Sequence, residues 1–85
     1  MTPLNFPRRF AIIDVLRAMA YLGLGEFREA VGYAKSALIE SKAVKSEYNI
    51  ARIAKVYKQL RDRHKRSSDV TELGRELAKT HPHLI

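Results

Sequence analysis

The sequence contains no cysteine and no tryptophan. Without cysteine, neither a disulfide framework nor thiolate ligation of a metal is possible, so stability must come from packing or from a partner. Long apolar runs are also missing: Asp14 and Arg17 interrupt the best one, and no uncharged stretch reaches the roughly 18 residues that suggest a membrane span. The first ten residues show no apolar run behind a basic start, so we expect no signal peptide. A cytoplasmic protein that does not engage a membrane is the expectation.

The residues that are present favour one small folded domain, over residues 1–85. Hydrophobic residues make up 46% of the chain, which is too many for a disordered tail. A chain of 85 residues forms a core near the lower limit for independent stability.

The net charge of +7 is concentrated in one part of the sequence. Residues 42–66 contain nine lysines and arginines but only two acids, Glu47 and Asp62, while acids and bases balance in the rest of the chain. The whole excess of positive charge therefore belongs to this segment, which we call the basic segment.

Apolar spacing predicts an all-α fold of four helices, and no segment alternates with the period of a strand. The first helix is expected over residues 6–24, with Asn5 as its N-cap and with Gly23 and Gly25 ending it through positive φ. Its apolar residues lie nearly all round the helix, which indicates contacts on more than one side. They are Phe10, Ile12, Ile13, Val15, Leu16, Met19, Tyr21 and Leu22.

The second helix is expected over residues 26–41, and the third runs from a cap at Ser46 to about Arg63. The second helix should face the core with small residues. The residues expected inward are Phe27, Ala30, Val31, Ala34, Ala37 and Leu38 on the second helix, and Ile50, Ile53, Val56, Tyr57 and Leu60 on the third.

A fourth helix is expected to open at Asp69, which has the spacing of a capping box with Glu72, and to stop before Pro82. Gly74 weakens this helix by about 1 kcal/mol relative to alanine. The inward residues are Val70, Leu73 and Leu77. The chain thus divides into a first helical hairpin over residues 6–44 and a basic helical hairpin over residues 46–80.

Small and aromatic residues surround the turn of the first hairpin. If Gly25 is set on the turn glycine of a tetratricopeptide repeat, Tyr21 falls on the tyrosine of the repeat's first helix and Phe27 on the aromatic after the turn. Ala30, Ala37 and Leu38 fall on the two alanines and the adjacent leucine of the second helix. Residues 11–44 therefore resemble one tetratricopeptide repeat, a 34-residue helix-turn-helix unit.

This stretch also departs from the repeat. Asp14 stands at the family's tryptophan, Arg17 at its leucine, Ala34 at an aromatic and Lys42 at the proline, while Ala18 replaces a glycine. These departures are typical of an outlying or terminal repeat. Because a solenoid usually needs about three repeats, we expect self-association, docking on a larger chain, or an unusually well packed small bundle.

Residues 20–38 and 41–63 together look like the C-terminal end of the repeat region in bacterial helix-turn-helix (XRE-type) transcriptional regulators. Those chains end with a Gly-Glu hairpin, an alanine-rich helix, a serine, a basic helix and a short final helix. The resemblance implies a region that senses peptides or mediates dimer contacts. It also implies that DNA binding belongs to a separate N-terminal domain, so the sequence is expected to be a fragment or a free-standing relative.

The first helix is the candidate surface for a protein or peptide partner, since in the repeat family this helix lines the concave groove. Asp14 and Arg17, three residues apart, fit either a polar grip in that groove or an intrahelical ion pair, and the ion pair is favoured. The candidate partner-binding residues are Ile12, Val15, Leu16 and Met19, with Asp14 and Arg17.

The third helix is the candidate surface for an anionic partner. At about 100° per residue, one half of it is basic and lies opposite the apolar arc. Its candidate residues are Arg52, Lys55, Lys58, Arg61, Arg63, Lys65 and Arg66. A solvated face, an acidic protein and nucleic acid are all compatible with this pattern. Tyr48, at its margin, is the one aromatic placed to stack on a base.

Catalysis is not indicated. His81 and His83 have no carboxylate or cysteine close in sequence to complete a metal site, and both are expected to be solvated. Ser67 and Ser68 near His64 are explained by turn formation and capping. We expect no enzyme, no metal and no cofactor. At the C-terminus, the apolar pair at residues 84–85 is expected to pack on the core rather than to wait for a partner.

The sequence therefore predicts a protein-interaction module of the tetratricopeptide type. The most concrete form is a regulatory or dimerisation domain that binds a protein or peptide. The alternative is a basic helical accessory protein that binds nucleic acid through the third helix.

Overall fold

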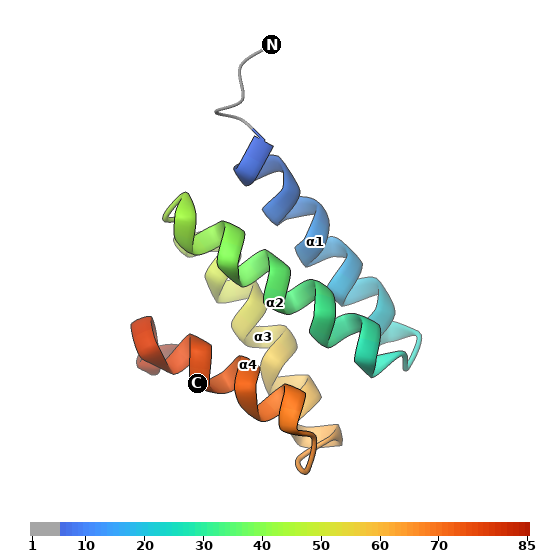
Figure 1. Ribbon diagram of the computed structural model, residues 1–85. Coiled ribbons are helices and arrows are strands. Elements are labelled where there is room, and N and C mark those ends of the chain that lie inside the picture. Colours follow the sequence, from blue (N-terminus) through green and yellow to red (C-terminus); the bar gives the residue numbers. More distant parts are fainter. Residues whose placement is uncertain (1–5) are drawn as a thin grey trace.

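The computed structural model describes residues 6–85, with side chains from residue 11 onward, as helices joined by short turns (Figure 1). Its elements are α1 (Phe6–Gly23), α2 (Phe27–Ala43), α3 (Glu47–Arg63), α4 (Ser68–Thr80) and a short 3-10 helix, η2 (Pro82–Leu84). Residues 6–85 contain no strand, so the predicted all-α fold of four helices is confirmed. The cap predicted at Asn5 lies outside the described residues.

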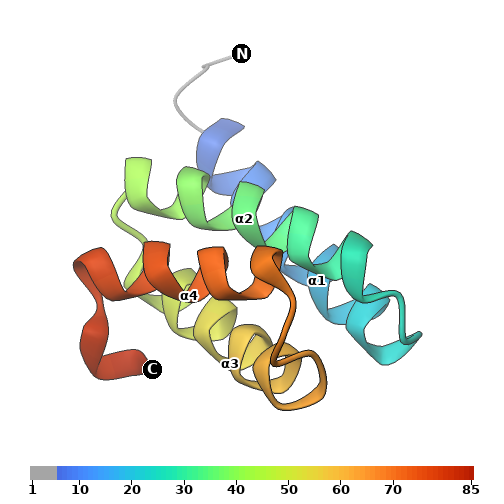
Figure 2. The ribbon, with the colours of Figure 1, turned by 60° about the horizontal axis from the view of Figure 1, so that its bottom comes forward.

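The four long helices form two layers (Figures 1 and 2). α1 packs against α2 and α3, and α4 packs against the same two helices. α2 and α4 make up one layer and α1 and α3 the other, so that α3 lies behind α2 in Figure 1. The side chains enclosed between the two layers form the core.

Small residues allow the helices to approach closely. Ala30, Ala34 and Ala37 on α2 are completely buried, as their spacing predicted. Around them lie the larger side chains that were expected inward on α3 and α4. The fully buried large residues include Val15, Ile50, Ile53, Leu60, Val70, Leu73 and Leu77. At the C-terminus, Leu84 packs against this core while Ile85 stays 40% exposed, so the predicted packing applies to Leu84.

Two turns of the same geometry connect α1 to α2 and α2 to α3. Each closes with a backbone hydrogen bond over five residues: the Glu26 N–H donates to the Tyr21 carbonyl, and the Ser46 N–H donates to the Ser41 carbonyl, both at 2.9 Å. This is the pattern of a Schellman motif, which needs one residue at positive φ. Gly25 takes this role in the first turn, with φ of 80°, and Lys45 takes it in the second, with φ of 55°.

Helix boundaries follow from these turns. α1 ends at Gly23, which has no positive φ, so only Gly25 of the two predicted glycines supplies it. α2 begins at Phe27 and continues to Ala43, two residues beyond its predicted end.

Serine side chains cap α3 and α4. Ser46 accepts a hydrogen bond from the Asn49 N–H at 3.4 Å, which confirms the predicted cap. The cap predicted at Asp69 is wrong. Ser67 is the N-cap of α4 and accepts from the Val70 N–H at 3.4 Å. Asp69 instead lies in the first turn, where a carboxylate is favoured by the helix dipole.

Gly74 allows α4 to approach α3. A Cβ atom at this position would lie 2.5 Å from the Cζ and hydroxyl atoms of Tyr57 on α3. The absence of a side chain therefore makes room for the tyrosine ring, which offsets the weakness that glycine brings to a helix.

Candidate functional site

An apolar stripe runs along the exposed side of α1. Ile12, Leu16 and Met19 are 42%, 51% and 44% exposed, although each is a large hydrophobic residue. They recur at four- and three-residue steps, which places them on one side of the helix. Val15, which was predicted to belong with them, is 1% exposed and lies in the core. A contiguous exposed apolar patch of this kind is typical of an interaction surface.

A second stripe, mostly basic, runs along the facing side of α3. It consists of Tyr48, Arg52, Lys55, Gln59 and Arg63, which follow the steps of four, three, four and four residues that keep side chains on one side of a helix. The aromatic ring at its start is 71% exposed. Arg52 and Lys55 were predicted as part of a basic face, and Arg63 as an anion contact.

The two stripes border one groove: Ile12 and Met19 belong to its lining, and Leu16 lies between them on the apolar stripe but outside the lining. A hollow of about 520 Å³ lies between Met19, Leu22 and Gly23 on α1 and the basic stripe with Val56 on α3. A smaller hollow of about 320 Å³ extends it toward Ile12 and the start of α3, sharing Tyr48 and Arg52. We call these two hollows together the α1–α3 groove. Its floor is apolar and its α3 wall carries positive charge.

Arg52 connects the two walls. Its guanidinium lies 5.4 Å from the centre of the Tyr48 ring, within the range of a cation–π interaction. One guanidinium nitrogen, Nη2, donates to the Sδ atom of Met19 at 3.6 Å. These are weak, exposed contacts, so Arg52 keeps most of its capacity to donate hydrogen bonds to a ligand.

No acid balances the charge of this wall. The side chains that line the α1–α3 groove include no aspartate or glutamate. Among residues 11–85, no carboxylate lies within 4.0 Å of the charged groups of Arg52, Lys55 or Arg63. The groove is therefore a place where a negatively charged ligand would gain, rather than replace, ion pairs.

Asp14 and Arg17 do not belong to this groove. Arg17 Nη1 lies 3.7 Å from Asp14 Oδ1, so the two form the intrahelical pair that was favoured from their spacing. The guanidinium of Arg17 also lies 5.4 Å from the centre of the Tyr33 ring on α2. The pair thus faces α2, whereas the apolar stripe borders α3.

Asp14 also lies near the carboxyl group of Glu40 on α2. The pKa of Glu40 is raised from 4.5 to about 7, mainly by burial and in addition by a hydrogen bond to Asp14 and by the charge of Asp14. The Oε1 atom of Glu40 is buried with no hydrogen-bond donor near it among the described residues. Below this pKa a proton on Glu40 allows two carboxyl groups to lie together between α1 and α2.

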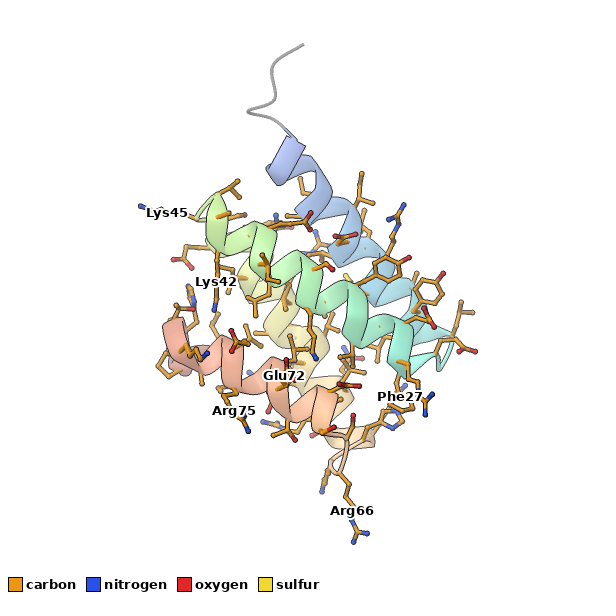
Figure 3. The ribbon with its side chains drawn as sticks, viewed as in Figure 1. Phe27, Lys42, Lys45, Arg66, Glu72 and Arg75 are labelled. Atoms are coloured by element: carbon orange, nitrogen blue, oxygen red, sulfur yellow. The ribbon has the colours of Figure 1, made fainter. Side chains whose placement is uncertain are left out.

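The remaining predicted cations lie away from the groove. Arg61 points toward Tyr57, with its guanidinium 5.6 Å from the ring centre, and its Nε lies 3.6 Å from Asp62. Lys58 is exposed on α3, outside both hollows. Lys65 and Arg66 lie in the α3–α4 turn, where Arg66 extends away from the helices (Figure 3). The single basic face predicted for the third helix is therefore divided among three surroundings.

The histidines make structural contacts. The prediction that His81 is solvated is wrong: its side chain is 11% exposed, and its Nε2 lies 2.6 Å from a carboxylate oxygen of Glu47 at the start of α3. His64 stacks on Phe27 with 3.9 Å between ring centres, which joins the α1–α2 turn to the end of α3. The described part of the chain contains no cluster of three or more histidine, cysteine or acidic side chains able to hold a metal.

Sequence reasoning missed the role of Leu22, Gly23, Val56 and Gln59 in the larger hollow, and of Val44, Lys45, Ser46 and Asn49 in the smaller one. Leu22 and Val56 were assigned to apolar faces without a role at the surface, Gly23 to the turn, and Gln59 to nothing. The signal was present for Gln59, because it continues the helical spacing of Tyr48, Arg52 and Lys55. That these two stripes border the same groove depends on how α1 and α3 pack, which spacing within one helix does not contain.

Comparison of the chain with protein families, curated proteins and solved structures gave no significant match. None of the helices in residues 6–85 combines the length and the apolar character needed to cross a membrane.

Proposed function

We propose that this chain is a helical protein-interaction module that binds a protein or peptide partner in the α1–α3 groove. The observation that carries the proposal is the apolar stripe of Ile12, Leu16 and Met19, which stays exposed beside a groove although the core of the same chain is tightly closed. Covering such a stripe removes apolar surface from water, which is the main source of binding free energy in most protein complexes.

The resemblance to a tetratricopeptide repeat supports the same proposal. Tyr21, Gly25 and Phe27, which carry that resemblance, flank the turn between α1 and α2. In the repeat family, the helix that corresponds to α1 lines the surface that grips peptides. A role as the regulatory or dimerisation part of a transcriptional regulator follows from the second resemblance and is part of the proposal.

Selection from a library of random 18-residue peptides tests this function. Peptides enriched on the unmodified protein should bind the variant Leu16→Glu at least about tenfold more weakly, because a buried carboxylate would replace an apolar contact. Ile39→Glu is the matched control, since Ile39 is 71% exposed on α2 and belongs neither to the apolar stripe of α1 nor to the lining of the groove. Its affinity should stay within about twofold.

Two results would overturn the proposal. One is a set of enriched peptides that bind Leu16→Glu and the unmodified protein equally well. The other is a set whose binding depends on Ile39 rather than Leu16. Light scattering of the same variants reports self-association separately: if the groove is a dimer surface, the unmodified protein is a dimer and Leu16→Glu is a monomer.

Nucleic acid is the second candidate partner. It is favoured by Lys58, Lys65 and Arg66, three cations outside the groove that have no carboxylate within 4.0 Å among residues 11–85. Charge reversal at Lys55, Lys58, Arg61 and Lys65 should then abolish binding of a labelled oligonucleotide. Affinity should also fall steeply with salt, because each phosphate contact releases counterions. Oligonucleotide binding that survives the reversal would contradict this candidate.

A further inference from the structure

Resting on the proposed function, we infer that the partner segment in the α1–α3 groove is an acidic amphipathic helix. Two properties of the groove indicate this occupant. These are the matched helical spacing of its two walls and the absence of acids along it.

The walls have the spacing of a helix-packing seam. On α1, Ile12, Leu16, Met19 and Gly23 follow steps of four, three and four residues. On α3, the basic stripe from Tyr48 to Arg63 follows these three steps and adds a fourth, of four residues. Side chains in such rows form ridges and grooves into which the rows of a third helix fit. The α1 row spans roughly 16 Å at about 1.5 Å per residue, the length of about three helical turns.

The two walls run side by side in register. α1 and α3 point in the same direction in Figure 1. Ile12 shares the smaller hollow with Tyr48, and Met19 and Gly23 share the larger one with Lys55, Gln59 and Arg63. A helix laid along the groove therefore meets an apolar row on one side and a basic row on the other over its whole contact length.

The complementary helix can be specified from these rows. Apolar residues at three- and four-residue steps would cover Ile12, Leu16 and Met19. Carboxylates along one flank would pair with Arg52, Lys55 and Arg63, which have no carboxylate within 4.0 Å among the described residues. Gly23 leaves room at one end, since nothing lies within 4 Å of the position a Cβ would take there.

The same features disfavour two other occupants. A second copy of the chain placed groove to groove would bring Arg52, Lys55 and Arg63 close to their own equivalents, and like charges across an interface are costly. A nucleic acid would pair with the basic wall but would leave the apolar row of α1 without a partner, and the groove offers a single exposed aromatic, Tyr48, for base stacking.

The test uses peptides enriched from the random library on the unmodified full chain. We expect them to carry aspartate and glutamate in excess, together with apolar residues at three- and four-residue steps. A proline placed in the middle of a synthetic copy should weaken binding at least tenfold, because it breaks the helix. The circular dichroism of the peptide should show added helix on binding.

Charge exchange tests the acidic flank. The triple variant Arg52→Glu, Lys55→Glu and Arg63→Glu should bind the peptide at least tenfold more weakly, and a peptide with its acids replaced by lysine should bind this variant better than it binds the unmodified protein. The matched control is Arg28→Glu, Arg75→Glu and Lys79→Glu. It changes the net charge by the same amount at exposed sites outside the groove and should change affinity less than threefold.

The outcomes separate this inference from the proposed function. Enriched peptides that depend on Leu16 but lack acids, or that tolerate the central proline, overturn the acidic helix and leave the groove as a peptide site. A dimer of the unmodified protein that becomes monomeric in Leu16→Glu makes a second copy the occupant and also overturns it. Equal loss of peptide affinity in both triple variants reduces the effect to net charge and contradicts pairing in the groove.

Discussion

The two layers of this molecule differ in how their surface charges are paired and in how much apolar surface they expose. In the α2–α4 layer, Lys35 lies 3.5 Å from both Asp69 and Glu72, and Lys79 lies 2.7 Å from Glu76. Lys42 reaches from α2 toward α4 (Figure 3) and donates to the backbone carbonyl of Glu76 at 2.8 Å. In the α1–α3 layer, the cations of the groove wall have no such partners within the described residues, and three large apolar side chains stay exposed.

The difference separates the charges that are paired within the fold from those that are not. Several charges of α2 and α4 are paired within the chain, and these ion pairs contribute modestly to stability, as surface pairs do. The exposed apolar and basic side chains along the α1–α3 groove lie outside the core, so their exposure and the single sign of their charge call for another explanation. Binding of a partner, as proposed above, would supply that explanation.

The largest expected effect compares the same substitution in the two layers. Leu73→Ala on α4 removes a completely buried side chain and should lower the free energy of unfolding by about 2–5 kcal/mol. Leu16→Ala on α1 should change it by less than about 0.5 kcal/mol, because this side chain is half exposed. Urea unfolding followed by circular dichroism measures both. A loss above about 1.5 kcal/mol for Leu16→Ala would assign Leu16 to the core and contradict the proposed difference between Leu16 and Leu73.

A smaller effect is expected at the contact between α3 and α4. Gly74→Ala should destabilise the protein by about 1–3 kcal/mol, because the new methyl group overlaps the Tyr57 ring. Gly32→Ala is the control: it lies in α2 with nothing within 4 Å of the new Cβ, and it should stabilise by up to about 1 kcal/mol. In a Tyr57→Ala background, Gly74→Ala should no longer lower the free energy of unfolding. A cost that persists there would mean that Tyr57 is not its cause.

The smallest of these effects depends on pH and concerns the junction of the two layers. Because the pKa of Glu40 is about 7 in the folded protein and 4.5 is its ordinary value, the folded state holds a proton that the unfolded chain has already released. Stability should therefore fall as pH rises from 4.5 to 7, by roughly 1–2 kcal/mol after allowance for partial exposure. Glu40→Gln should remove this part of the pH dependence. An unchanged slope of stability against pH in that variant would contradict the role given to Glu40.

Much of the fold could be predicted from the sequence because it depends on local chemistry. Helical spacing, the glycine at residue 25 and the serine cap at residue 46 act within a few residues. Two details could not be predicted. Lys45 adopts positive φ without being glycine, since the turn around it imposes that conformation. Ser67 takes the capping role expected of Asp69, a choice between neighbours with similar propensity.

The candidate site could be predicted only in part. Ile12, Leu16, Met19, Arg52, Lys55 and Arg63 were all named, but on two separate surfaces. Their meeting in one groove depends on the packing of α1 against α3, and so does the separation of Asp14 and Arg17 from it. In the same way, the contact of His81 with Glu47 joins residues 34 positions apart in the chain, a distance over which no pattern in the sequence carries information.

The most direct test of the central claim is a map of amide chemical shifts on addition of an enriched peptide to the isotope-labelled protein. If the peptide binds in the α1–α3 groove, the largest changes lie along α1 from Ile12 to Gly23 and along α3 from Tyr48 to Arg63. Changes concentrated on α2 and α4, or confined to the α3–α4 turn around Lys65 and Arg66, would contradict it.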